Sequence, residues 1–186
     1  MHLLVGLGNI GREYEATRHN FGFLLCDQII DDYRFSNQGK KFRSEVFSGE
    51  ILGQKILALK PQTFMNLSGA AVAEAANFYK IPNQKILVLH DDVDVEFGRI
   101  KVKIGGGHGG HNGLRSIDEA IGKDYMRLRL GVGRPMSKEF DTADYVLGKF
   151  SKEEMAEVEK INAKISKLLG CLLEGKGDEF STKFYL

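Results

Sequence analysis

The sequence predicts a single α/β domain, an α/β/α sandwich around a mixed, mostly parallel and twisted central sheet. Short apolar runs alternate with longer amphipathic segments along the 186 residues, which is the pattern of strands and helices in turn. The segment Lys85–Leu89 ends in four consecutive apolar residues, as expected for an interior strand that is covered on both faces. Neither a repeat nor a low-complexity linker divides the chain, so we expect one domain over residues 1–186.

In the first half of the chain, apolar runs of strand length lie at 2–5, 45–51 and 55–59. Leu52-Gly53-Gln54 joins the last two runs in hairpin fashion, and residues 40–43 before them are expected to form a basic loop. Helical patterns of this half lie at 23–33 and 70–79. The second helix is rich in alanine, and either Asn66 or Ser68 is placed to cap it.

In the second half, strand patterns lie at 85–89, 99–104 and 126–132. The middle pattern alternates basic and apolar residues and predicts a half-exposed strand. Helical patterns lie at 114–121 and 151–173. The first helix follows a glycine-rich loop at 105–113 and stops at Gly122, while Ser151 and Glu154 form a capping box before the second. No secondary structure is assigned to residues 136–143.

The charges of the chain nearly balance, with 26 basic and 25 acidic side chains and a net charge of +1. RNA-binding proteins usually carry a clear positive excess, so an RNA partner would require a local cluster of basic residues. Because no apolar run reaches the length of a membrane span and no signal-like leader is recognisable, we expect no membrane contact. Cys26 and Cys171 lie among apolar residues, which predicts buried, reduced thiols in a cytoplasmic protein.

Four polar or glycine-rich segments carry the candidate chemistry. The first, Gly6-Leu7-Gly8-Asn9-Ile10-Gly11, has the G-x-G-x-x-G spacing of a dinucleotide-binding turn. The residues after Gly11 are polar rather than helical, however, and Asp31 and Asp32 end a helical segment instead of a second strand. A tight turn that presents Asn9 at a site is the favoured interpretation, and a dehydrogenase is the alternative.

The second segment gathers the polar residues Tyr14, Thr17, Arg18, His19 and Asn20 between the first strand and the first helix. A histidine in such a place is more often structural than catalytic, but the neighbouring carboxamides and tyrosine favour a site. The third segment, His90-Asp91-Asp92-Val93-Asp94, follows the interior strand. Its carboxylates could bind Mg²⁺ in a phosphoesterase, orient an imidazole as in hydrolase triads, or be solvated in a simple turn.

The fourth segment, Gly105–Gly113, is rich in glycine, which lets a backbone approach a ligand closely. His111-Asn112 begins the following helix, where free N–H groups favour anions. His108 and His111 suggest a zinc site, but no third ligand has suitable spacing, and a flexible loop is the other interpretation. The lysine and hydroxyl residue of a Walker loop are missing, which argues against a nucleoside triphosphatase.

Several polar residues, three of them from these segments, lie shortly beyond predicted strands, namely Asn9, Asn66, Asp91 and His111. Open α/β sheets bind ligands beyond the carboxyl ends of their strands, so we expect these side chains to share one site. No serine lies in a G-x-S-x-G turn, and neither cysteine has a polar setting. Water is therefore the expected nucleophile.

With these segments in place, the chain resembles the bacterial peptidyl-tRNA hydrolase family. The matching blocks are VGLGNIG at 5–11, Tyr14 with TRHN at 17–20, KPQTFMNLSG at 60–69, HDDVD at 90–94, GGHNGLRS at 109–116, RLRLGVGRP at 127–135 and DYVLGKF at 144–150. They occur in this order along most of the chain. Phe64 stands where some members have tyrosine, and the region after Gly175 matches poorly.

The resemblance implies a metal-independent esterase without a cofactor, which removes a peptide or an N-blocked amino acid from the terminal ribose of tRNA. It implies that His19 is the general base that activates water and that Asp91 stabilises and orients the imidazole. Asn9 would distinguish a blocked aminoacyl end from a free amino group. The residues implied in substrate binding are Tyr14, Phe64, Asn66, His111 and Asn112, with Lys103 and Arg134 at the terminal tRNA phosphate.

The implied partner is peptidyl-tRNA, contacted at its CCA end and acceptor stem, and the chain is expected to be a monomer without an obligate protein partner. The Asn66 amide and nearby backbone N–H groups are candidate donors to the oxyanion. The basic residues expected to attract phosphate are Lys101, Lys103, Arg127, Arg129 and Arg134. A non-catalytic RNA-binding relative on the same fold is the main alternative.

Overall fold

Seven strands form one mixed sheet in the order β2-β3-β4-β1-β5-β7-β6, in a computed structural model that describes residues 1–186. Their bounds are β1 His2–Gly6, β2 Ser36–Lys41, β3 Ser44–Ile51, β4 Gln54–Pro61, β5 Ile86–Asp92, β6 Ile100–Ile104 and β7 Met126–Gly131. The inner strands β4, β1, β5 and β7 are parallel, whereas the outer strands are attached by antiparallel pairings. The predicted mixed sheet is confirmed, and the carboxyl ends of its inner strands meet at one edge.

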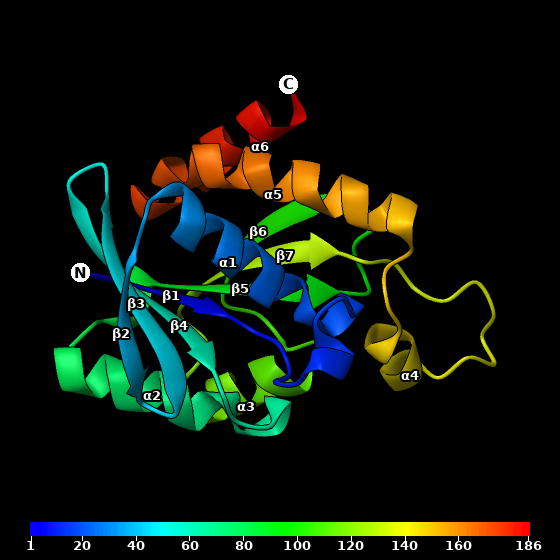
Figure 1. Cartoon of the computed structure of the whole chain (residues 1–186), viewed down its shortest axis with the longest axis horizontal. Helices are drawn as coiled ribbons and strands as arrows, with labels where there is room; N and C mark the ends of the chain where they lie inside the picture. The colour runs from blue at the N-terminus through cyan, green and yellow to red at the C-terminus, as the bar shows by residue number, and fades with distance from the viewer.

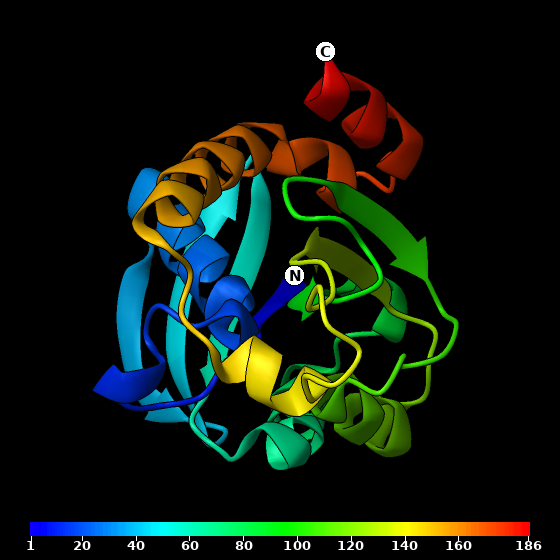
Figure 2. The same ribbon diagram turned by 90° about the vertical axis from the view of Figure 1, so that its right-hand side faces the viewer.

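Helices cover both faces of this sheet, as predicted for a three-layer sandwich (Figure 1). On one face lie α1 Phe21–Asp32, α5 Lys152–Leu173 and α6 Gly177–Tyr185, and on the other lie α2 Ser68–Tyr79 and α3 Asn112–Ile121. The short helix α4, Thr142–Leu147, belongs to neither layer and lies beyond the end of the sheet (Figure 2). None of the helices combines the length and the apolar character that crossing a bilayer requires.

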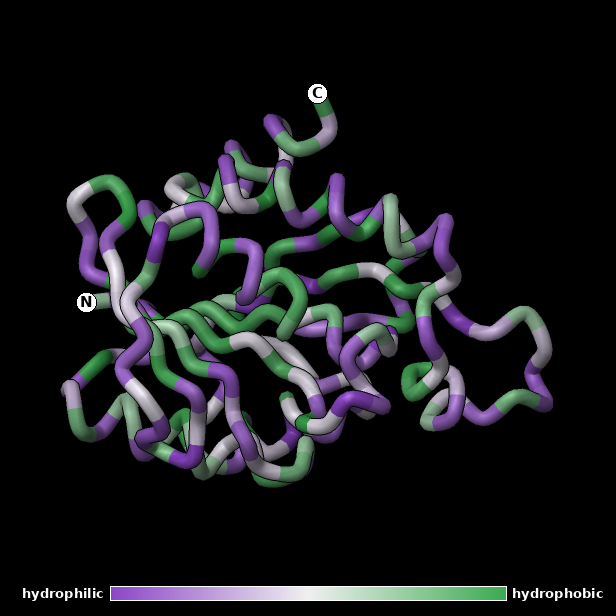
Figure 3. The backbone as a smooth tube through the Cα atoms, viewed as in Figure 1, coloured by the Kyte–Doolittle hydropathy of each residue, from purple (hydrophilic) through white to green (hydrophobic).

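Each face of the sheet has its own apolar core, because successive side chains of a strand point to opposite faces. In β1, Leu4 packs into the core under α1, α5 and α6, while Leu3 and Val5 pack into the core under α2 and α3. The inner strands are hydrophobic along most of their length, as Figure 3 shows. Two helix layers thus hold the sheet rigid and leave its carboxyl edge open for a site.

Glycines allow α1 to lie unusually close to the sheet. A Cβ atom on Gly22 would stand 2.2 Å from the carbonyl oxygen of Leu89, and one on Gly6 would stand 2.7 Å from the Cβ of Cys26. No larger residue fits at either place without moving the helix. Part of the glycine pattern at the start of the chain therefore serves helix packing.

The segment after the first strand does not form a dinucleotide-binding turn. The chain continues past Gly11 through two 3-10 turns, Arg12–Tyr14 and Arg18–Asn20, and α1 begins only at Phe21. A dinucleotide-binding turn needs a helix that starts at the third glycine, so that its N-terminus faces the pyrophosphate. The G-x-G-x-x-G spacing is thus not accompanied by the structure that gives it this function.

The expected basic loop at 40–43 is half strand and half turn. Lys40 and Lys41 belong to β2, and only Phe42 and Arg43 form the turn to β3, with φ angles of 51° and 53°. The β2 residues, Ser-Asn-Gln-Gly-Lys-Lys, are all exposed and carry no apolar alternation. A polar, lysine-containing edge strand resists pairing with other chains. The same composition lacks the apolar alternation by which a strand is predicted from sequence.

The predicted cap of α2 is also wrong, since neither Asn66 nor Ser68 caps the helix. Leu67 occupies the N-cap position, where no side chain bonds the first N–H groups. The Ser68 hydroxyl instead donates to the Met65 carbonyl oxygen at 2.7 Å. A 3-10 turn at Met65–Leu67 leads directly into α2, which leaves the Asn66 side chain free for another role.

The C-terminal region contains the predicted helix and one that was not predicted. The capping box of α5 is confirmed, because the Glu154 N–H donates to the Ser151 hydroxyl at 3.1 Å and the Ser151 N–H to the Glu154 carboxylate at 2.9 Å. The additional helix α6 brings Tyr185 to the edge strand β6. Its hydroxyl accepts from the Ile100 N–H at 2.9 Å and donates to the Ile100 carbonyl at 2.8 Å.

We expect Gly22→Ala to lower the free energy of unfolding by roughly 2 kcal/mol, because overpacking against the Leu89 carbonyl outweighs the helix propensity that alanine gains. Urea unfolding followed by circular dichroism measures the difference. Asp31→Ala, an exposed change on the same helix, is the control and should shift stability by less than about 0.5 kcal/mol. A Gly22→Ala variant as stable as the wild type would contradict the close packing of α1.

Candidate active site

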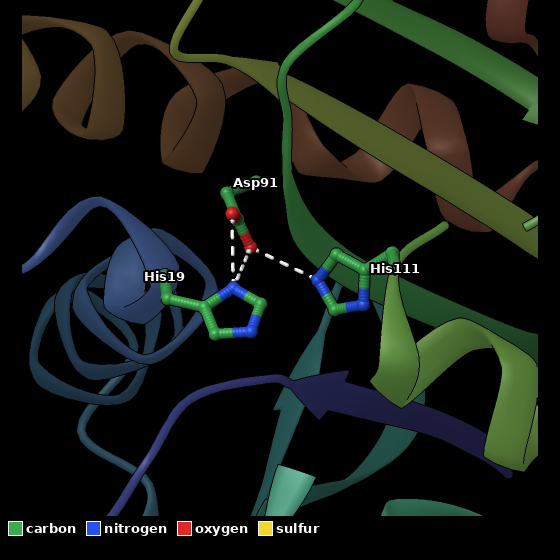
Figure 4. A group of neighbouring side chains, drawn as sticks. All are labelled: His19, Asp91 and His111. Carbon is green, nitrogen blue, oxygen red and sulfur yellow. Dashed lines mark hydrogen bonds and ion pairs between the residues drawn. The ribbon is translucent and has the colours of Figure 1, made fainter. Parts of the chain in front are cut away.

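Asp91 brings two histidines together at the carboxyl edge of the sheet (Figure 4). Its carboxylate, near the end of β5, lies between His19 from the turn Arg18–Asn20 and His111 at the start of α3. His19 Nδ1 is 3.0 Å from each Asp91 oxygen, and His111 Nε2 is 2.9 Å from Oδ1. A single carboxylate thus serves two imidazoles that come from segments far apart in the sequence.

The hydrogen bonds of His111 determine its tautomer. Its Nδ1 lies 3.1 Å from the Gly113 nitrogen and 3.3 Å from the Leu114 nitrogen, so it accepts from both N–H groups and caps α3. A ring nitrogen that accepts cannot carry the proton, so Nε2 carries it and donates to Asp91. His111 is therefore a neutral donor to Asp91, and it occupies N–H groups that the sequence had suggested for an anion.

His19 has the complementary arrangement. Asp91 accepts from its Nδ1–H, which leaves Nε2 of the neutral ring as an acceptor without a hydrogen bond to the protein. The His19 side chain is only 12% exposed, yet the residue lines an open cleft. Nε2 is therefore the ring atom available to take a proton from a water molecule in this cleft.

Charge and burial act in opposite directions on this pair. Burial alone would lower the pKa of His19, but the charge and hydrogen bond of Asp91 outweigh it and raise the pKa above its ordinary value of 6.5. Burial alone would raise the pKa of Asp91, but the two imidazoles hold this pKa well below its usual range. Asp91 therefore stays ionised at neutral pH and stabilises the protonated form of His19.

The cleft beside His19 has a volume of about 720 Å³. The residues predicted for the site that line it are Asn9, His19, Asp91, Lys103, His111, Asn112 and Arg134. Helix α4 contributes a wall that sequence reasoning did not anticipate, through Thr142, Ala143, Val146 and Leu147. This helix is short and follows a loop without apolar periodicity, so no pattern marked it as part of a site.

The other predicted binding residues lie outside this cleft. Asn66 lines a second cavity of about 470 Å³, and because Met65 and Asn112 line both cavities, the two adjoin. Phe64 is 81% exposed, and Tyr14 is half-buried on its 3-10 turn. Neither aromatic residue lines the two cavities, so the structure brings together the polar residues but not these two rings.

Asn20 fixes the loop that carries Asn9. The Asn20 side-chain oxygen accepts from the Asn9 N–H at 2.8 Å, and its amide nitrogen donates to the Asn9 carbonyl at 2.9 Å. Asn20 is itself buried, so this pair of bonds is shielded from water. The backbone of Asn9 is held on both sides while its side chain remains without a protein partner at the edge of the cleft.

The three carboxylates of the segment 90–94 do not converge on a common point. Asp92 accepts from Arg129 Nε at 2.7 Å, and Asp94 pairs with Arg134 at 2.6 Å, while Asp91 faces the two histidines. Each carboxylate is thus engaged by a different partner. A Mg²⁺ ion, which prefers a near-octahedral set of oxygen ligands, would not find one here.

His19, Asp91 and His111 do offer ligand atoms within 4.8 Å of one another. A transition metal at this place would need the Nε2 lone pair of His111. That atom carries the proton as long as Nδ1 caps α3, so metal binding would cost the helix its cap. The donor set therefore fits hydrogen bonding better than metal coordination.

The family model described as peptidyl-tRNA hydrolase matches residues 3–185. The chain belongs to the peptidyl-tRNA hydrolase family. A relative of that name from Rickettsia bellii is 50% identical over 184 residues, which cover 98% of this chain and 99% of the relative. One from Sinorhizobium fredii is 46% identical over 186 residues, 100% of this chain and 77% of the relative. The crystal structure of peptidyl-tRNA hydrolase from Acinetobacter baumannii, 39% identical, matches with a TM-score of 0.92 over 99% of this chain and 94% of that one.

In this member of the hydrolase family, His90 supports the site from behind, a role that sequence reasoning missed. Its Nδ1 donates to the Asp91 carbonyl oxygen at 2.7 Å, and its ring meets the His111 ring edge-on with centroids 5.3 Å apart. Burial, with the nearby His111, lowers the pKa of His90 to about 4. His90 is therefore uncharged at neutral pH and packs behind the pair of Asp91 and His111.

Of the five basic residues that the sequence suggested for phosphate attraction in this hydrolase, four line the cleft and Lys101 does not. Arg127 is one of these four, but it is buried and pairs with Asp118 at 2.8 Å, so its charge is largely compensated within the protein. Arg129 and Arg134 line the cleft but are already paired with aspartates. Lys103 lines the cleft without an ion-pair partner. Free positive charge at the site thus comes mainly from Lys103.

We expect Asp91→Asn to lower the pKa of His19 to 6.5 or below, because burial then acts without the opposing negative charge. Wild-type His19 should titrate above that value, so the neutral, basic form should appear at a higher pH in the wild type than in the variant. NMR titration of the imidazole ring measures both. Asp92→Asn, which removes a carboxylate bound to Arg129 instead, is the control. An unchanged His19 pKa in Asp91→Asn would contradict the assignment.

Proposed function

We propose that the chain hydrolyses the ester between a peptide, or an N-blocked amino acid, and the terminal ribose of tRNA, with His19 as the general base. The observation that carries this proposal is the His19–Asp91 pair, whose free Nε2 borders a cleft large enough for the end of a substrate. Membership in the peptidyl-tRNA hydrolase family supplies the substrate class. Such an activity would recycle tRNA from peptidyl-tRNA that stalled ribosomes release.

The proposed reaction uses water because neither a cysteine nor a serine lines the cleft, and the Thr142 hydroxyl makes no hydrogen bond to His19. Burial raises the pKa of the Cys26 thiol to about 12, so this thiol stays protonated and unreactive. His19 Nε2 takes a proton from water while the water oxygen attacks the ester carbonyl carbon. When the bond to the ribose oxygen breaks, the imidazolium returns this proton to the ribose oxygen, which leaves as a hydroxyl.

Stabilisation of the tetrahedral oxyanion is assigned to the Asn66 amide. Asn66 is exposed, makes no hydrogen bond as a helix cap and lines the cavity that adjoins the cleft. An amide N–H aimed at the developing charge contributes more in the transition state than in the ground state. The ester would then lie across the boundary of the two cavities, beside Met65 and Asn112.

Recognition of the two ends of the substrate is divided between different groups. Asn9, with its backbone held by Asn20, would distinguish a blocked aminoacyl end from one with a free amino group. Lys103, and Arg134 through its remaining N–H groups, would bind the terminal tRNA phosphate. The exposed ring of Phe64 would stack on the substrate. Tyr14 is also proposed to bind the substrate. His111 is proposed to support the site through its hydrogen bond to Asp91.

The proposal includes a cytoplasmic monomer that needs no metal, cofactor or protein partner. A non-catalytic RNA-binding protein on the same fold would have no need of a free, basic imidazole beside an ionised carboxylate. This pair therefore favours the enzyme over that alternative.

We expect the wild type to release peptide from N-acetyl-aminoacyl-tRNA in the presence of EDTA and His19→Ala to be slower by roughly 10²- to 10⁴-fold, the usual contribution of a general base. Acid precipitation of the remaining labelled tRNA ester measures the rate. His2→Gln, at the opposite end of β1, is the matched histidine control. Loss of wild-type turnover in EDTA would indicate a metal-dependent hydrolase, and bound tRNA without turnover would indicate the RNA-binding alternative.

Asn66→Asp should lower kcat by roughly 10²- to 10³-fold, because it replaces an oxyanion donor by a group that cannot donate. Steady-state kinetics on the same substrate separate kcat from KM. Asn77→Asp, the same chemical change at an exposed position of α2, should leave both parameters unchanged. Wild-type turnover by Asn66→Asp would remove Asn66 from the oxyanion role.

A further inference from the structure

Arg127 is a buried arginine whose hydrogen bonds are directed at a loop. It is 1% exposed, and its guanidinium lies over the Tyr125 ring at 4.7 Å from the centroid. One nitrogen donates to the Gly107 carbonyl at 2.8 Å, and the other terminal nitrogen donates to the Gly106 carbonyl at 3.2 Å and to Asp118 at 2.8 Å. Burying a charge is costly unless it is fully paired, so this arrangement calls for an explanation.

The glycine-rich loop that Arg127 contacts has few other attachments. Gly105 and Gly106 have φ angles of 71° and 86°, a backbone region that glycine enters freely. The Gly105 N–H reaches the Tyr125 carbonyl at a long 3.4 Å, and the next backbone bond is made within the loop, from His111 to His108. At Gly106 and Gly107, the hydrogen bonds from Arg127 attach the loop to the sheet.

The same loop forms a wall of the catalytic cleft. Its residues Gly107, His108, Gly109 and Gly110 line the cleft and lead directly to His111. The Lys103 side chain lies against Gly106, since a Cβ there would stand 2.5 Å from the Lys103 Nζ. A loop of glycines has high conformational entropy when it is unanchored. Fixing Gly106 and Gly107 therefore fixes the wall and the place of Lys103.

We infer that Arg127, which itself lines the cleft, is a positioning residue that holds the glycine-rich loop in the shape that admits the tRNA end. The inference rests on the proposed function, since it assigns the loop to substrate affinity. From the sequence, Arg127 was expected to attract phosphate. The positioning role takes the place of that expectation. Asp118 balances the charge, and the loop carbonyls accept from the two terminal nitrogens, whereas the buried Nε has no partner.

The double variant Arg127→Met/Asp118→Leu tests this role without leaving an unpaired buried charge. We expect KM for N-acetyl-aminoacyl-tRNA to rise about tenfold while kcat changes less than about threefold, because the loop shapes binding rather than chemistry. The pH profile should stay unchanged, as the His19–Asp91 pair is intact. Hydrogen exchange in residues 105–110 should become faster.

A matched control removes another lysine- or arginine-carboxylate pair that lies away from the loop. Lys60 and Asp27 are 2.7 Å apart, between β4 and α1, and Lys60→Met/Asp27→Leu should alter stability but neither KM nor loop exchange. Arg127→Lys keeps the charge next to Asp118 but loses the planar fork that reaches both carbonyls. This variant should have a KM between those of the wild type and the double variant. It tests the inference if the double variant does not fold.

A folded double variant with the KM and the loop exchange of the wild type would overturn the inference. A rise in KM that is equally large in the Lys60 and Asp27 control would also overturn it, because the effect would then be general destabilisation. If the wild type has no esterase activity, the proposed function fails. The exchange of residues 105–110 still decides whether Arg127 holds the loop.

Discussion

The site depends on one buried carboxylate with two imidazole donors. Asp91 is 2% exposed, and an ionised group so deeply buried is tolerated only when hydrogen-bond donors surround it. His111 supplies one donor whose tautomer is fixed by the cap that it gives to α3. The second donor must then be His19 Nδ1, which turns Nε2 toward the cleft. Helix capping on one side of Asp91 is thus linked to the orientation of the base on the other.

The topology explains why these groups can meet. Asp91 lies near the carboxyl end of the parallel strand β5, and the Asn9 loop follows the neighbouring β1, so both are at the same edge of the sheet. The two turns between Gly11 and Phe21 bring His19 to that edge before α1 runs back along the sheet. Close packing of α1 through Gly22 holds the start of the helix in place. Gly6 and Gly8, two glycines of the spacing that resembles a cofactor motif, likewise pack closely against Cys26 and Phe23 of α1.

Much of the fold and many of the site residues could be predicted from the sequence, because both depend on strong local patterns. Apolar runs predicted the inner strands, and polar residues shortly after them predicted that Asn9, Asp91 and His111 lie together, as they do in the cleft. The role of His19 was implied only by the family resemblance. The polar edge strand β2 and the short helix α4 lack such patterns, so they were missed. The shared use of Asp91 by His111 and the burial of Arg127 depend on contacts between distant segments. An alternating strand does not reveal which of its basic residues faces solvent.

The pairing of charges explains how a chain with a net charge of +1 can act on tRNA. Asp92 and Asp94 neutralise Arg129 and Arg134 at the rim of the cleft, while Asp118 neutralises Arg127 inside. Binding that relies on many phosphate contacts would release many counterions and require an excess of free basic residues. This site instead exposes Lys103 beside amide groups suited to the ester and its ribose. Under the proposed function, selectivity comes from the chemistry of the tRNA end, and only weakly from the charge of its backbone.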